Sequence, residues 1–109
     1  MTLLCRLDEL PENEGRGFTV TAQGRDVPIV VVRRGDRVFA YMNVCPHRGT
    51  SLDWMPDRFM DPEGRFLQCA THDARFEVET GHCVAGPCRG DALAAIDVVV
   101  EKGQVRVRN

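Results

Sequence analysis

The sequence has almost no lysine, since Lys102 is the only one among its 109 residues and nearly all of its positive charge is arginine. The formal net charge is −2 and the pI is about 5.9. A protein that binds nucleic acid usually has a strongly basic surface that neutralises phosphates. We therefore expect no nucleic acid among the partners of this chain.

Long apolar runs are also missing. The longest, Pro28–Val32, has the length of a strand and falls far short of the roughly 18 residues of a membrane-spanning helix. The segment from Met1 to Glu9 has no basic stretch followed by an apolar one, so no signal peptide is visible. We expect a cytoplasmic protein with no membrane partner. In that reducing compartment, the five cysteines fit metal ligands or free thiols better than a disulfide framework.

Short runs of Val, Ile and Phe alternate with polar residues and are separated by turn formers, a pattern that predicts an all-β antiparallel domain. The length fits a single domain over residues 1–109. The expected strands are Leu3–Leu7, Phe18–Ala22, Val27–Arg33, Val38–Asn43, Arg65–Cys69, Arg75–Val78, Ala95–Glu101 and Gln104–Arg108.

The expected connections have recognisable turn chemistry. Arg34–Asp36 and Glu101–Gly103 each offer a glycine for a left-handed hairpin position. Asp61–Gly64 has proline second and glycine fourth, as in a type I turn. Helical turns are expected only within Pro11–Gly15 and Ser51–Met60, and Pro56 limits the second.

Two short motifs each combine one cysteine with one histidine, Cys45-Pro46-His47 and Cys69-Ala70-Thr71-His72. Each motif follows an expected strand that can hold its side chains in place. A Cys-x-His motif followed by a Cys-x-x-His motif resembles the Rieske family of iron–sulfur proteins. Arg48-Gly49 after the first motif, and Gly86-Pro87 after the second, extend this resemblance.

The resemblance covers roughly residues 38–87 and implies both a fold and a cofactor. The fold is an antiparallel, β-sandwich-like Rieske domain with a loop-built cluster-binding lobe over approximately residues 44–88. The cofactor is one [2Fe–2S] cluster, with two cysteines on one iron and two histidines on the other. The implied ligands, which are also the implied metal site, are Cys45, His47, Cys69 and His72.

Imidazole ligands explain what such a cluster does. Two ferric ions, two sulfides and two thiolates sum to a neutral oxidised cluster, whereas four thiolates would leave two negative charges. A neutral centre accepts an electron more readily, so the reduction potential is higher than with thiolates alone. We expect a one-electron carrier with a ferredoxin reductase and a terminal oxygenase, or another redox enzyme, as partners. The chain is too short to add the catalytic iron domain of Rieske oxygenases, so it is not expected to be an enzyme.

Two alternatives stay open at this point. The chain could be a small subunit of a nitrite-reductase-like complex. The same four side chains could also bind a structural zinc ion in an interaction module. Zinc fingers usually group two cysteines and two histidines separately, whereas each motif here is mixed.

Departures from high-potential Rieske proteins favour a low potential. Thr50 and Thr71 stand where those proteins have a disulfide, and Ala74 and Phe76 stand where they have a serine and a tyrosine that donate to the cluster. Loss of two donors disfavours the extra electron. We therefore expect a negative midpoint potential, around −150 mV.

Other side chains near the motifs have structural interpretations. Asp73, where the family usually has glycine, fits a tolerated turn residue. Cys83 and Cys88 are expected to be free thiols rather than a pair. Packing of the long loop onto the β base, rather than docking of a partner, is expected for three side chains: Trp54, Met55 and Phe59.

Overall fold

The computed structural model describes residues 2–46, 52, 59–69, 74–86 and 90–108. One short 3-10 helix, η1 (Leu7–Glu9), lies among its strands. The strands are β1 (Thr2–Arg6), β2 (Gly15–Ala22), β3 (Arg25–Arg34), β4 (Arg37–Met42), β5 (Phe66–Gln68), β6 (Arg75–Glu77), β7 (Cys83–Ala85), β8 (Ala95–Ile96), β9 (Val98–Glu101) and β10 (Gln104–Val107). Over these residues, no helix has the length and apolar character needed to cross a membrane.

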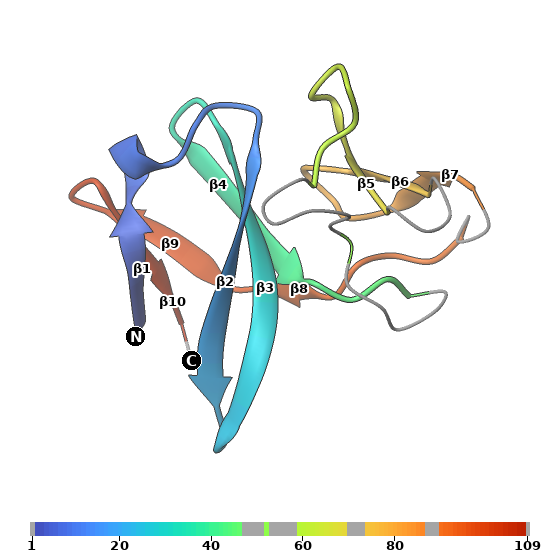
Figure 1. Ribbon diagram of the computed structural model, residues 1–109. Helices are drawn as coiled ribbons and strands as arrows, with labels where there is room; N and C mark the ends of the chain where they lie inside the picture. Colours follow the sequence, from blue (N-terminus) through green and yellow to red (C-terminus); the bar gives the residue numbers. More distant parts are fainter. Residues whose placement is uncertain (1, 47–51, 53–58, 70–73, 87–89, 109) are drawn as a thin grey trace.

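The strands form three antiparallel sheets. Their orders are β1-β10-β9, β2-β3-β4-β8 and β5-β6-β7. The first two sheets form a base, and the third forms a smaller lobe to one side of it (Figure 1). Thr2 on β1 pairs with Val107 on β10, so the two ends of the described chain lie together on the base.

Strand β3 lies between the base and the lobe and contributes side chains to the cores of both. Its residues Ile29–Val32 are all 0% exposed, because successive side chains of a strand point to opposite faces and both faces here are covered. Ile29 and Val31 belong to the core of the base, together with Val105 and Val107. Val30 and Val32 belong to a second core, which we call the lobe core, together with Leu67 and Phe76. Burial on both faces explains why this strand is the longest apolar run of the sequence.

The structure confirms the all-β antiparallel fold and the chemistry of the turns. Gly35 and Gly103 have φ angles of 61° and 73°, the left-handed conformation that the hairpins were predicted to need. Gly64 N donates to Asp61 O at 2.9 Å, closing the predicted turn. Asp61 reinforces that turn because its Oδ1 accepts from Arg65 N at 2.8 Å.

Three sequence predictions need correction. The strand predicted over 95–101 divides at Asp97, since β8 pairs with β4 while β9 pairs with β10. The segment Pro11–Gly15 has no helical turn, because Asn13 N donates to Arg33 O at 2.9 Å and Gly15 already pairs with β3. Strand β7 was not predicted. Most of Ser51–Met60 lies outside the described residues.

Candidate metal centre

The two predicted cysteine ligands follow two strand ends. Cys45 comes three residues after the end of β4, and Cys69 comes directly after β5. Both side chains are 0% exposed, and both belong to the lobe core. The fold therefore brings two thiols that are distant in sequence into one buried environment. His47 and His72 lie outside the described residues.

Main-chain hydrogen bonds fix the strand ends from which both motifs leave. Before the first motif, Met42 N donates to Ala94 O at 2.8 Å and Asn43 N donates to Pro28 O at 2.9 Å. At the second motif, Cys69 N donates to Ala74 O at 2.8 Å. That bond joins the two described residues that flank the rest of the second motif, between β5 and β6.

The donor set of these loops fits an iron–sulfur cluster. Buried thiolates are soft ligands that suit iron–sulfur and zinc sites. In the part of the chain that the structure describes, no three His, Cys, Asp or Glu side chains converge on one point. Cys45 and Cys69 are thus the described half of the predicted quartet, and each comes from a loop that also contains a predicted histidine ligand.

The wall beside the second loop is apolar. Ala74 and Phe76 are both 0% exposed. Because neither side chain has a hydroxyl, neither gives the core a hydrogen-bond donor. Gly86 lies directly against Ala74, because a Cβ atom built on Gly86 would stand 2.8 Å from Ala74 Cα. Its φ of 93° is a second reason why only glycine fits there. Gly86, the first residue of the predicted Gly-Pro pair, therefore packs tightly on the residue that closes the second loop.

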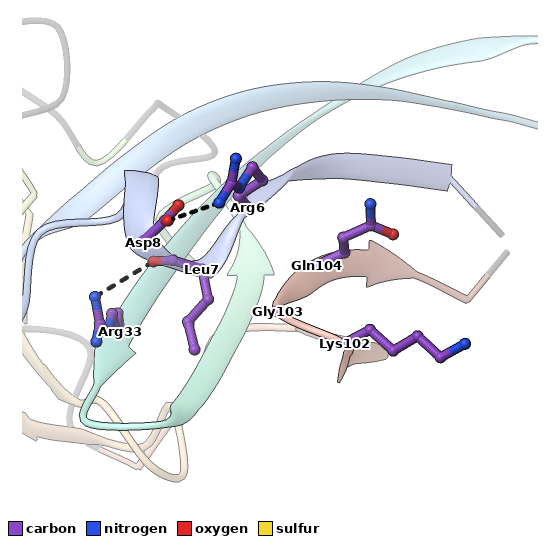
Figure 2. A pocket seen from close by; sticks show the side chains of 7 residues that line it. All are labelled: Arg6, Leu7, Asp8, Arg33, Lys102, Gly103 and Gln104. Atoms are coloured by element: carbon purple, nitrogen blue, oxygen red, sulfur yellow. Dashed lines mark hydrogen bonds and ion pairs between the residues drawn. The ribbon is translucent and has the colours of Figure 1, made fainter.

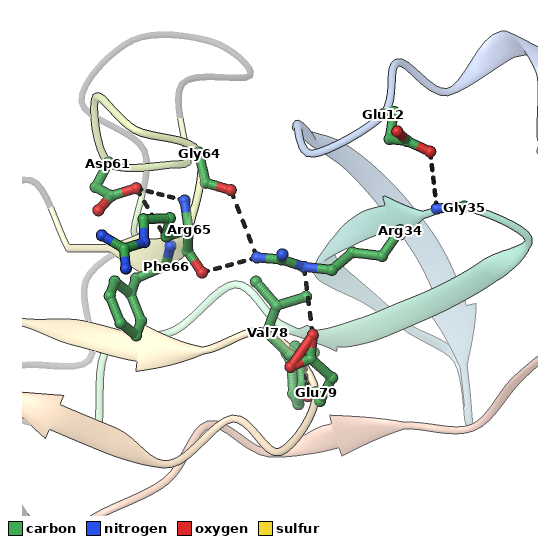
Figure 3. Close-up of polar contacts among 10 residues, drawn as sticks. Glu12, Arg34, Gly35, Asp61, Gly64, Arg65, Phe66, Val78 and Glu79 are labelled. Carbon is green, nitrogen blue, oxygen red and sulfur yellow. Dashed lines mark hydrogen bonds and ion pairs between the residues drawn. The ribbon is translucent and has the colours of Figure 1, made fainter.

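Two polar side chains of the base hold the lobe, and neither was singled out from the sequence. Arg34 on β3 donates from Nη2 to Arg65 O at 2.7 Å, and its Nε lies 3.4 Å from Glu79 Oε1 (Figure 3). Tyr41 on β4 donates its hydroxyl to Val78 O at 2.6 Å. Burial, with a smaller contribution from Glu79, raises the pKa of Tyr41 to about 12. A polar residue within an apolar strand is the sequence signal for both.

The remaining predicted residues divide between buried and undescribed positions. Phe59 is 1% exposed and packs in the lobe core. It also lies against Gly15 of the base strand β2, as the predicted packing onto the base requires. Cys83 is also buried, and its thiol donates to Ala85 O at 3.1 Å. Other positions that were interpreted from the sequence lie outside the described residues: Arg48, Gly49, Thr50, Trp54, Met55, Pro56, Thr71, Asp73, Pro87 and Cys88.

A polar cleft of 410 Å³ lies on the base and not in the lobe (Figure 2). Arg6, Arg33 and Lys102 contribute to its lining. The guanidinium of Arg33 is already engaged, since it donates to Leu10 O at 3.1 Å and to Gly35 O at 2.7 Å. Arg6 pairs with Asp8 at 3.0 Å. Both of these arginines are therefore already engaged by groups of the fold, where β1, β3 and β10 meet.

Comparison with known proteins shows the family of this chain. The sequence model of the Rieske [2Fe-2S] domain family matches residues 1–104. The chain belongs to the Rieske [2Fe–2S] domain family. It is 33% identical over 104 residues to the ferredoxin component of the p-cumate 2,3-dioxygenase system of Pseudomonas putida, covering 95% of this chain and 81% of that protein.

Similar solved structures agree with this fold. The ferredoxin of carbazole 1,9a-dioxygenase from Nocardioides aromaticivorans is 31% identical, with a TM-score of 0.72 over 98% of this chain and 97% of that one. A complex of reduced oxygenase and oxidized ferredoxin in carbazole 1,9a-dioxygenase contains a match at 28% identity and a TM-score of 0.74, covering 96% and 89%. A structure assigned as an NADH-dependent nitrite reductase small subunit from Mycobacterium tuberculosis matches at 25% identity and a TM-score of 0.69, covering 97% and 91%.

This Rieske protein therefore carries a [2Fe–2S] cluster and transfers electrons, and the zinc alternative gives way to the cluster. The cluster supplies one-electron redox chemistry. In the described part of the chain, the two motif thiols and the apolar side chains of Ala74 and Phe76 are buried in one core. Like its ferredoxin relatives, it is an electron-transfer component and not the enzyme that acts on the substrate.

Proposed function

We propose that this protein is a low-potential Rieske ferredoxin that delivers single electrons to a terminal oxygenase. Cys45, His47, Cys69 and His72 hold its cluster, and a ferredoxin reductase supplies its electrons. The whole chain, 1–109, is one domain whose cluster-binding lobe spans approximately residues 44–88. It acts in the cytoplasm.

The observation that carries the ligand assignment is the burial of two thiols in one core. Cys45 and Cys69 are separated by more than twenty positions, yet both are fully buried in the lobe core. Cys83 shares that core, but its thiol donates to Ala85 O within its own strand. The two motif cysteines are therefore the thiols that the two anchored loops present together, and each motif adds one histidine.

The low potential follows from the apolar wall. Ala74 and Phe76 occupy buried positions in the strand that follows the second motif, where a hydroxyl would stabilise the reduced cluster. Without those donors, the added negative charge of the reduced cluster has less stabilisation, which lowers the potential. A low-potential centre suits delivery of electrons to an oxygenase.

The partner follows from the relatives. Both ferredoxins named above are components of dioxygenase systems, and a related ferredoxin is solved in complex with its oxygenase. The similarity to a nitrite reductase small subunit supports a second candidate, a permanent subunit of a nitrite-reductase-like complex. A carrier exists free between its two partners, whereas a permanent subunit copurifies with a large partner.

Electron transfer to an oxygenase tests the proposal directly. The reduced protein is mixed in a stopped-flow instrument with the oxidised oxygenase of an aromatic-ring dioxygenase, and the visible absorbance of both clusters is followed. We expect complete reoxidation of the ferredoxin within seconds and a monomeric protein by sedimentation. Copurification with a sulfite- or nitrite-reducing subunit, together with no reoxidation by any oxygenase, would instead establish the second candidate.

A further inference from the structure

Asn43 is a buried polar residue at the junction of β4 and the first ligand loop. It is 8% exposed and stands two positions before Cys45. In the described part of the chain, Asp61 and the phenol of Tyr41 are the other polar side chains buried to this degree. A buried amide costs free energy unless its polar atoms have partners. Its contacts therefore indicate why an amide occupies this position.

Asn43 joins the two ends of the first ligand loop. Its side-chain Oδ1 accepts a hydrogen bond from Leu52 N at 2.7 Å. Its main-chain N–H donates to Pro28 O on β3 at 2.9 Å. Leu52 is fully buried in the lobe core, as is Cys45. Asn43 and Leu52, which stand on either side of the first Cys-x-His motif, are thus held together, and Asn43 attaches the pair to the base.

The second ligand loop is closed in a different way. There the closing bond runs from Cys69 N to Ala74 O, between two main-chain groups. A main-chain bond does not depend on the identity of either side chain. The closing contact of the first loop uses a side-chain oxygen, so a single substitution can remove it. The two halves of the proposed ligand set therefore differ in how their geometry is fixed.

We propose that Asn43 is a positioning residue that sets the position of Cys45, at the start of the first ligand motif, by holding Leu52 N on the far side of that motif. The inference rests on the ligand set given under Proposed function. Asn43 acts through the backbone: the bond fixes how far apart positions 43 and 52 lie. Without it, Leu52 N is a buried donor that has lost its acceptor, and the loop gains conformational freedom.

Hydrogen–deuterium exchange at the Leu52 amide, read by mass spectrometry on the purified holoprotein, tests the contact. Asn43→Ala removes the acceptor and should speed exchange at Leu52 at least tenfold. Asn43→Asp keeps an acceptor oxygen at the same reach and should leave the exchange within threefold of the wild type. Asp61→Ala is the matched control, because it removes another buried side-chain acceptor of main-chain N–H groups, those of Arg65 and Phe66. It should not change exchange at Leu52.

Low-temperature EPR of the reduced protein tests the positioning role. We expect Asn43→Ala to broaden or shift the cluster signal and to speed loss of the cluster to a chelator severalfold. Asn43→Asp should restore the width of the signal, and Asp61→Ala should give the wild-type signal. If Asn43→Ala does not fold, Asn43→Asp alone still tests the proposal. An unprotected Leu52 amide in Asn43→Asp would overturn it.

Two other outcomes would also overturn it. One is a wild-type EPR signal and cluster lifetime in Asn43→Ala despite faster exchange at Leu52. The other is equal damage in Asn43→Ala and Asn43→Asp. Failure of the ligand set itself is distinguishable, because the wild-type protein would then lack the Rieske signal, whereas the exchange at Leu52 is measured independently of that signal.

Discussion

At the scale of single residues, two buried apolar side chains follow the second motif. Ala74 and Phe76 are fully buried, and Phe76 pairs across the lobe sheet with Leu67 on one side and Cys83 on the other. A hydroxyl at either position would enter a region from which water is excluded. Hydrogen bonds are strong in such surroundings, so small changes here should move the potential by large amounts.

The first prediction concerns these two positions. The double variant Ala74→Ser, Phe76→Tyr should raise the midpoint potential by on the order of 100–200 mV. Each charge-assisted hydrogen bond contributes about 1.5–3 kcal/mol. For one electron, 59 mV corresponds to about 1.4 kcal/mol. Protein-film voltammetry measures the midpoint potential of each protein. Phe66→Tyr adds the same hydroxyl to a half-buried position of the neighbouring strand β5 and should leave the potential nearly unchanged. A wild-type midpoint above about +100 mV would contradict the low-potential assignment.

The second prediction concerns Tyr41, the only tyrosine of the chain. Its pKa is raised from 10.0 to about 12 in the folded protein. The phenol is protonated in both states well below pH 10, and the unfolded chain ionises first as the pH rises toward and past 10. Folding stability should therefore fall between pH 10 and pH 12, by roughly 2 kcal/mol.

Chemical denaturation at pH 9 and pH 12 measures that loss, with Tyr41→Phe as the reference. The phenylalanine variant should be less stable than the wild type at pH 9, because Val78 O loses its donor, but it should lack the additional alkaline loss. An identical pH dependence in both proteins would refute the assigned pKa.

At the scale of elements, the protein has two hydrophobic cores, which lie on opposite faces of strand β3. The base core contains residues of β1, β9 and β10, whereas the lobe core contains both motif cysteines. Removing the metal should therefore affect the two cores unequally, because ligand bonds hold the loops of the lobe while the base has continuous sheet pairing.

The third prediction follows from this division. After removal of the cluster with a chelator under reducing conditions, amide exchange in β5, β6 and β7 should rise at least tenfold. The amides of β3 and β10 should keep most of their protection. Hydrogen–deuterium exchange of the apoprotein and the holoprotein provides the measurement. Equal loss of protection in both regions would show that the base does not fold independently of the lobe.

The same division explains what the sequence could and could not predict. The alternation of apolar residues predicted the long strands of the base and their hairpins, because those elements depend on local patterns. The division of the stretch 95–101 could not be predicted, since β8 and β9 pair with different sheets and Asp97 between them accepts a bond from Arg108 N at 2.9 Å.

At the site, the cysteine and histidine spacing predicted the motifs and the resemblance to a family. It could not predict Asn43, Arg34 or Tyr41, because their roles depend on main-chain groups that are distant in sequence, such as Arg65 O and Val78 O. A local pattern carries no signal for such contacts. Their polar character in or beside apolar strands was the clue that the sequence offered.

At the scale of the whole molecule, the protein is an electron-transfer module made of a base and a lobe. Arg34 and Tyr41, on β3 and β4 of the base, attach the lobe, whose core contains both motif cysteines. Its relatives include ferredoxin components of dioxygenase systems. A carrier of this kind needs a cluster whose ligands keep their geometry in both oxidation states.

The central claim is that two histidines and two cysteines, His47, His72, Cys45 and Cys69, hold one [2Fe–2S] cluster. Pulsed EPR of the reduced protein, purified anaerobically from iron-replete cells, tests it most directly, since nitrogen nuclei bound to iron couple to the unpaired electron. We predict two strongly coupled nitrogens in the wild type and loss of the Rieske signal in His47→Ala and in His72→Ala. A cluster signal without nitrogen coupling, or a colourless protein with stoichiometric zinc, would contradict the account.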